Sequence, residues 1–193
     1  MSASFTSDIE PFIRMGAFSG VFLAVALWEA HAPRRERAFT RRARWPHNLG
    51  LLALDVLVLR VVAPGAAIGV ALAGEARGWG LIHAFGLPGW TAVPLVVVLL
   101  DLAIYFQHIL FHAVPGLWRL HRVHHSDRDF DVTTGTRFHP IEILLSTVMK
   151  MAAVAAIGAP VVAVLVFEVL LNATAVFNHA NARLPETVDR WLR

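Results

Sequence analysis

The chain has 193 residues, room for about one domain, with 56% hydrophobic residues, 16% charged residues and a net charge of +3. Soluble domains typically carry about 25% charged residues, so this composition excludes an ordinary soluble domain and a disordered chain. The sequence contains no cysteine, which excludes disulfide scaffolds, thiolate metal sites and iron–sulfur clusters and leaves ten histidines as the main candidates for metal or acid–base chemistry.

The apolar segments are long enough to cross a bilayer, which takes roughly 20 helical residues. Three spans are predicted at residues 11–29, 48–74 and 91–112. A longer apolar block at 141–177 is divided at Gly158 and Pro160, because proline ends a helix and forces the residue before it into extended geometry. The two halves either cross separately or form a helical hairpin. The sequence therefore predicts an all-α polytopic membrane protein with four to five transmembrane helices and a cytoplasmic histidine-rich cap.

Arginines are concentrated at residues 34–44, 119–137 and 183–193. Positive residues favour the cytoplasmic side, and counting the crossings places all three groups there. We interpret residues 34–44 as a topogenic loop and expect no nucleic-acid partner. Arg14 and Glu29, near the ends of the first span, are expected to snorkel toward the interface. The preference for arginine and alanine indicates a bacterial chain, and hence the bacterial inner membrane.

Histidines cluster at the predicted cytoplasmic ends of the spans in the patterns HxxxH and HxxHH, followed by one at the end of the last span. The candidate metal ligands are His108, His112, His121, His124, His125 and His179. Within each pattern the side chains share a helix face, and Pro115 and Gly116 predict a turn that folds one group over the other. Imidazole suits iron, zinc, copper or nickel, and more than four converging rings favour two metal ions over one.

The segment from Asp101 to Ser126 resembles the fatty acid hydroxylase / sterol desaturase superfamily, as do the later runs RFHPIE at 137–142 and FNHAN at 177–181. The resemblance extends from residue 101 to the end of the chain. It implies an integral membrane oxygenase whose histidines bind two non-haem iron ions. Such an enzyme uses O2 and electrons from a reductase, cytochrome or ferredoxin to hydroxylate or desaturate a sterol or fatty acyl C–H bond in lipid biosynthesis. The six histidines would then be iron ligands.

The family pattern ends with another HxxHH box, and none follows within these 193 residues. We therefore expect a fragment or a truncated product with an incomplete dinuclear site. The expected organisation is an N-terminal transmembrane region at 1–90, with the arginine-rich loop, and a C-terminally incomplete fatty acid hydroxylase-like domain at 91–193. One alternative is an inactive paralogue or a non-enzymatic metal-binding membrane protein. Another is a zinc-dependent membrane hydrolase, for which Asp127 is the nearest candidate base.

Charged residues inside predicted spans cost roughly 2.5–3.5 kcal/mol each and usually face the bundle interior. Asp101 lies on the helix face of His108, and Glu168 lies on the face of Asn172. These side chains would form a polar lining that leads from the metal site into the bilayer; alternatively, Lys150 forms a structural ion pair with Asp101 or Glu168.

His139 precedes Pro140 at the start of a span. We expect it to support the site from outside the ligand set, or to be structural, rather than to bind metal.

Overall fold

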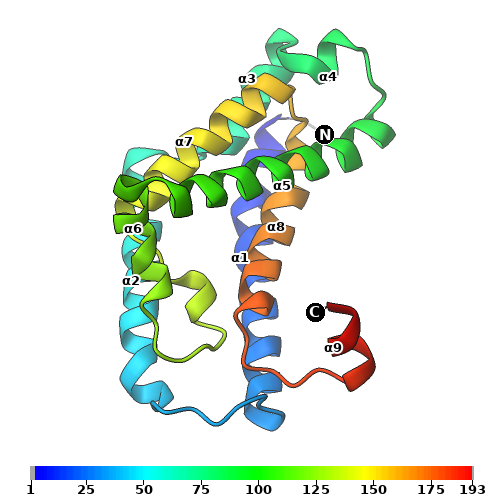
Figure 1. Ribbon diagram of the computed structural model, residues 1–193. Helices are drawn as coiled ribbons and strands as arrows, with labels where there is room; N and C mark the ends of the chain where they lie inside the picture. The colour runs from blue at the N-terminus through cyan, green and yellow to red at the C-terminus, as the bar shows by residue number, and fades with distance from the viewer. Residues whose placement is uncertain (1–2, 193) are drawn as a thin grey trace.

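The computed structural model describes the backbone of residues 3–192 and the side chains of residues 9–191 (Figure 1). The described chain is helical and has no strand, only an isolated bridge between Pro33 and Ala182. The helices are α1 (Ala3–His31), α2 (Arg41–Val62), α3 (Ala66–Arg77), α4 (Gly80–Ala84), α5 (Gly89–Ala113), α6 (Pro115–His125), the 3-10 turn η1 (Thr134–Thr136), α7 (Pro140–Ile157), α8 (Val161–Asn178) and α9 (Glu186–Leu192).

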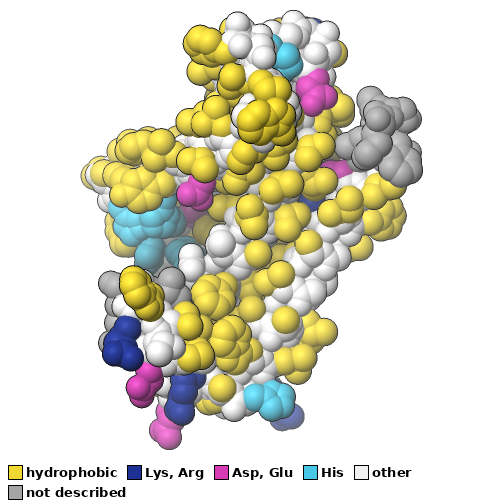
Figure 2. Space-filling view, turned by 90° about the vertical axis from the view of Figure 1, so that its right-hand side faces the viewer, with side chains coloured by type: hydrophobic (Ala, Val, Ile, Leu, Met, Phe, Trp, Pro, Cys, Tyr) yellow, Lys and Arg dark blue, Asp and Glu magenta, His cyan; other side chains and the backbone are white. Residues whose placement is uncertain are grey.

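Five helical segments are long and apolar enough to cross a membrane: Ile9–His31, Arg41–Ala84, Gly89–Ala113, Pro140–Ile157 and Val161–Asn178. Hydrophobic side chains cover much of the surface seen in Figure 2. Among them, Val61 is 73% exposed and Val98 is 63% exposed. A soluble protein rarely exposes so extensive an apolar surface. The predicted all-α polytopic membrane protein is therefore confirmed.

The second predicted span, residues 48–74, is interrupted in the structure. α2 ends at Val62, and Pro64 and Gly65 separate it from α3. Proline cannot donate the backbone hydrogen bond that would continue the helix, and Gly65 takes a left-handed conformation with φ of 64°. α3 consequently turns away from α2 and packs against α7 and α8.

The main hydrophobic core lies among α3, α5, α7 and α8, where Val96, Val154 and Val164 are completely or almost completely buried. α7 and α8 are separated at Gly158, as the sequence predicts, and Gly158 has φ of 74°. α7 packs mainly against α3 and α5, whereas α8 packs mainly against α1 and α5. The two helices therefore share the core through α3 and α5 instead of packing directly against each other as a hairpin.

Charged groups in the spans pair inside the bundle. Nη1 of Arg14 lies 2.6 Å from Oε1 of Glu10 and 3.2 Å from Oε2 of Glu168, and Lys150 also pairs with Glu168. Glu29 is completely buried. The expectation that Glu29 snorkels to the interface is wrong, because its side chain is buried and finds polar partners within the protein. The side chain of Arg14 is 39% exposed while it pairs with Glu10 and Glu168.

Candidate metal centre

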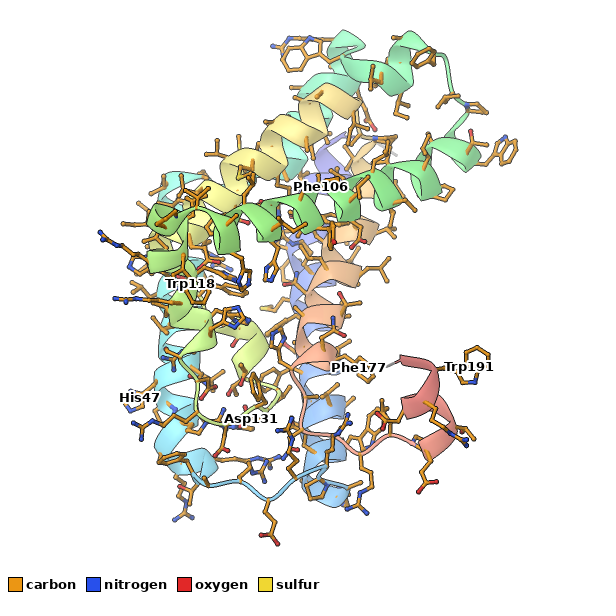
Figure 3. The ribbon with its side chains drawn as sticks, in the orientation of Figure 1. His47, Phe106, Trp118, Asp131, Phe177 and Trp191 are labelled. Atoms are coloured by element: carbon orange, nitrogen blue, oxygen red, sulfur yellow. The ribbon has the colours of Figure 1, made fainter. Side chains whose placement is uncertain are left out.

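A single extended residue, Val114, connects α5 to α6. Its φ of −94° and ψ of 117° are the geometry that a following proline imposes, and Pro115 occupies the first turn of α6. α6 therefore folds back against the end of α5. Trp118, labelled in Figure 3, stacks beside the histidines, with its ring centroid 5.2 Å from that of His112.

Four imidazoles converge where these two helices meet. The four-histidine group consists of His108, His112, His121 and His125. One ligand nitrogen from each ring lies within 4.8 Å of the others. The Nε2 atoms of His108 and His112 are 3.1 Å apart, and those of His125 and His121 are 3.2 Å apart. Ligands about 2.0–2.1 Å from a tetrahedral ion are separated by about 3.3 Å, so this spacing fits one metal ion.

The other two candidate ligands form a separate pair. Nε2 of His124 lies 3.0 Å from Nε2 of His179, which comes from the end of α8. The ring of His124 is 5.0 Å from that of His125, so the His124–His179 pair adjoins the four-histidine group. All six sequence-predicted ligands thus gather in one place, divided into four and two. Within the described residues, the four-histidine group is the one set of three or more metal-ligating side chains whose ligand atoms converge.

Three of the six rings have an acceptor at the nitrogen that faces away from the cluster. Nδ1 of His121 lies 2.6 Å from Oε1 of Glu142. Nδ1 of His124 lies 3.3 Å from the carbonyl oxygen of Arg137, and Nδ1 of His179 lies 2.6 Å from that of Ala175. An acceptor at Nδ1 favours the tautomer that carries its proton there and presents a free Nε2, which is how proteins orient metal-binding histidines.

The electrostatics of α6 favour neutral rings. Burial, followed by repulsion from His179 and His125, lowers the pKa of His124 to about 3. Burial and the neighbouring His121 and His112 also lower the pKa of His125. Because a metal ion binds the unprotonated imidazole, these rings are ready to act as ligands near neutral pH.

The arginine cap holds the segment between α6 and α7 against α2; it consists of Arg44, Asn48, Asp127, Asp131 and Arg137. Arg44 donates from Nη2 to Asp127 at 2.6 Å and from Nη1 to Asp131 at 2.7 Å. Asn48 donates to Asp127 at 3.0 Å and accepts from Arg137 at 2.9 Å. Asp131, labelled in Figure 3, lies between α2 and α1. Burial works to raise the pKa of Asp127, but hydrogen bonds from Arg44, Thr134 and Asn48 outweigh it and lower that pKa.

Glu29 fixes the position of the last histidine. Its Oε1 accepts hydrogen bonds from the backbone N–H of Val132 and of Asn181, both at 2.7 Å. Asn181 stands two residues after His179, so the end of α1 ties the loop after α6 to the end of α8. This buried carboxylate thereby supports the meeting of His124 and His179.

The remaining predicted site residues lie in varied surroundings. Asp101 is exposed and has no ion-pair partner among the described residues. Glu168 pairs with Lys150 and Arg14, and its backbone oxygen accepts from Asn172 at 2.8 Å. Within residues 9–191, no hydrogen bond joins Asp101, Glu168 or Asn172 to the six histidines. The Lys150–Glu168 pair is the structural alternative that the sequence offered.

His139 caps α7, since its Nδ1 accepts from the backbone N–H of Ile141 at 3.1 Å. Among the described residues, the side chain of His139 forms no hydrogen bond with any of the six candidate ligands.

Sequence reasoning missed Glu142 as a partner of His121, and it missed Arg44 as the centre of a buried network. The acidic residues 127, 129 and 131, which face an arginine-rich loop, were the signal for the arginine cap. Nothing in the sequence indicated which carboxylate would meet His121, because the two residues lie on different helices.

The cluster is accessible from outside. Figure 2 shows histidine side chains gathered at the surface, with an acidic side chain and hydrophobic residues beside them. His108, His112 and His125 are exposed, whereas His121 is buried. A ligand or substrate can therefore reach the four-histidine group without the bundle opening.

Comparison with known proteins gives one match. A family model described as "Fatty acid hydroxylase" matches residues 93–193, slightly more than half of the chain. The matched segment contains all six candidate ligands and Glu142. No curated protein and no solved structure matches the chain.

Proposed function

Because this chain belongs to the fatty acid hydroxylase family, we propose that it is a membrane-bound di-iron oxygenase that hydroxylates or desaturates a sterol or fatty acyl C–H bond in lipid biosynthesis. Membership of this family supports a lipid hydroxylase or desaturase function in general. The family is, in general, a class of di-iron enzymes. We propose in addition that this chain binds two iron ions, depends on O2 and acts on a sterol or a fatty acyl chain.

The convergence of imidazole nitrogens carries the proposal. The four-histidine group would hold one iron ion, and His124 and His179 would contribute to a second. Iron, when bound, would supply the O2 chemistry that amino-acid side chains cannot perform. The protein's own contribution is to favour the unprotonated form of His124 and His125, to orient the rings through Glu142 and the backbone carbonyls, and to place them beside the bilayer.

A small cavity supports access by a lipid. It has a volume of about 110 Å³ and lies between α5 and α7, bounded by Leu100 and Gln107 on α5 and by Met149 and Lys150 on α7. Gln107 directly precedes His108 in α5, although none of the four histidines lines the cavity. We propose that part of a lipid chain occupies this cavity while its reacting carbon lies at the histidines. In this proposal Asp101, Glu168 and Asn172 remain candidates for the polar part of that route.

The position of Asp127 favours an oxygenase over a zinc-dependent hydrolase. Both carboxylate oxygens accept hydrogen bonds from Arg44, and Oδ2 also accepts from Asn48. A general base must have a free oxygen directed at the water or substrate. Asp127 instead serves the arginine cap.

The arginine-rich segments meet at one end of the molecule: Arg34 donates its backbone N–H to Asn181, and Arg44 bonds to the segment after α6. By the positive-inside rule we propose that this end is cytoplasmic, in a bacterial inner membrane. A reductase, cytochrome or ferredoxin would then deliver electrons to the exposed side of the cluster.

One observation favours a second candidate, a metal-binding membrane protein without turnover. The His124–His179 pair offers only two imidazoles among the described residues, which is few for a second metal ion.

The two candidates are separated by incubating the iron-loaded full chain in lipid vesicles with a reductase system and O2. We expect hydroxylated or desaturated lipid by mass spectrometry under O2 and none under N2, and none from His125→Ala. Bound iron without any lipid product would favour the second candidate.

A further inference from the structure

Two buried carboxylates, Glu142 beside the four-histidine group and Asp55 on the adjoining helix α2, lack the partners that buried carboxylates normally have. Glu142 is 5% exposed, and its Oε2 has no hydrogen-bond partner. Asp55 is 4% exposed, and neither of its oxygens has one. Burying a carboxylate without a partner is costly, so this arrangement needs a physical reason.

The other buried acids of the described chain are arranged differently. Glu168 pairs with Lys150, Asp131 pairs with Arg44, and Glu29 pairs with Arg41. Glu142 forms a salt bridge with His121 alone among the described residues, and Asp55 forms none. Asp55 and Glu142 are also close enough to interact electrostatically across the contact between α2 and α7. Neither carboxylate has an Arg or Lys partner among the described residues.

A metal ion at the four-histidine group would provide that balance. Neutral imidazoles contribute no charge, so a divalent cation held by them retains its two positive charges. Such a charge is stabilised by nearby anions, most strongly on the side of the group where His121 is buried. Glu142 reaches the group through His121, which donates from Nδ1 to Oε1 at 2.6 Å while its Nε2 faces the other rings. Asp55 lies on α2, which packs against the helix of Glu142, α7.

We propose that Glu142 and Asp55 are the built-in counter-charge of the four-histidine group: Glu142 positions His121, and the two carboxylates together tighten the binding of a divalent cation there. This inference rests on the proposed function in so far as that function places a metal ion among these histidines. Glu142 and Asp55 are positioning residues, since they act through His121 and through charge and touch no reacting atom.

The proposal predicts opposite effects with and without metal. In the metal-free protein neither buried carboxylate has a cation beside it, so replacing either one by its amide raises the thermal midpoint or leaves it unchanged. In the metal-bound protein the same change removes compensating charge and weakens binding. A merely structural role would lower the midpoint of the metal-free protein and leave metal affinity as it was.

The test is Fe(II) affinity, measured anaerobically on the full chain in detergent by competition with a chromophoric chelator, together with the thermal midpoint of the metal-free protein. We expect Glu142→Gln and Asp55→Asn each to weaken Fe(II) binding at least tenfold, within the range usual for partners of metal-binding histidines. Glu142→Asp should recover part of the loss. The matched control is Glu10→Gln, a buried carboxylate of α1 that pairs with Arg14, which should bind Fe(II) within twofold of the unmodified chain.

Each outcome decides the matter. If the unmodified chain binds Fe(II) and both variants bind it equally well, the counter-charge is overturned while the metal centre stands. If the unmodified chain binds no Fe(II), both proposals fall. Should Glu142→Gln not fold, Asp55→Asn decides alone, because Asp55 has no hydrogen bond to any described side chain.

Discussion

The arginine cap and the four-histidine group are both polar, and both are built onto α6 or the residues just after it, but their charges are arranged in opposite ways. In the cap, Arg44 meets two aspartates, and Asn48 and Arg137 complete the hydrogen bonding. In the histidine group, four imidazole rings face one another, and Glu142, which contacts His121, has no Arg or Lys partner among the described residues. The charges of the cap balance one another, whereas in our proposal the histidine group is balanced only when a cation is bound. By that proposal the cap is a scaffold and the histidine group is a binding site.

Removing the central guanidinium of the cap should have the largest effect. Arg44→Ala leaves Asp127 and Asp131 buried without their cation, and breaking such a pair typically costs about 3–5 kcal/mol. The loss is measured as the free energy of unfolding in detergent. Arg42→Ala, at an exposed position of the same helix, is the control and should change stability little. Equal effects of the two substitutions would mean that the cap is not a scaffold.

A smaller loss of stability is expected from a substitution at Gly135, where η1 lies against α8. A Cβ added at Gly135 would lie 2.5 Å from the carbonyl oxygen of Ala175, so Gly135→Ala must push η1 away from α8. Overpacking of this kind typically costs about 1–3 kcal/mol. Gly50→Ala is the control, since its Cβ would meet no atom within 4 Å. The comparison is made by thermal unfolding, and a Gly135→Ala variant as stable as Gly50→Ala would contradict the close approach.

The smallest expected effect is a change in the free energy of unfolding with pH, which differs between His124, beside the four-histidine group, and Asp127, in the arginine cap. His124 has a pKa lowered to about 3 in the folded protein, below the unfolded value of about 6.5. Protonation therefore favours unfolding, and the stability of the metal-free protein falls as pH drops below about 6.5, by at most about 1.4 kcal/mol per pH unit for this ring. The pKa of Asp127 is lowered as well, so its contribution is complete above about 3.9 and is lost only at lower pH.

Unfolding of the metal-free chain at pH 7, 6 and 5 measures this dependence. His124→Gln should flatten the decline, while Asp127→Asn should leave its slope unchanged in that range. A decline of the same slope in His124→Gln would show that other groups cause it.

The sequence could predict what depends on local geometry. Residues 108 and 112 share a helix face at any place in a fold, and Pro115 imposes its turn on the residue before it. The same geometry explains why the six histidines divide into four and two. His124 is turned by about 100° around α6 from its neighbour His125, so it faces α8 while His125 faces α5.

The sequence could not predict which side chains far apart along the chain would pair in the folded protein. Glu142 follows His121 by 21 positions, and Asp127 follows Arg44 by 83. Charge alone does not say which partner a side chain will meet after folding. The arginine-rich loop was therefore interpreted only as a topology signal, although Arg44 within it is buried at the centre of the cap.

The central claim, that these histidines hold iron, is tested most directly by iron K-edge X-ray absorption of the Fe(II)-loaded full chain. The account predicts scattering from several imidazole rings, reduced in His108→Ala and in His125→Ala and unchanged in His31→Ala, whose ring lies against the backbone of α1. Iron that shows no imidazole scattering, or a spectrum unchanged in His108→Ala and His125→Ala, would contradict it.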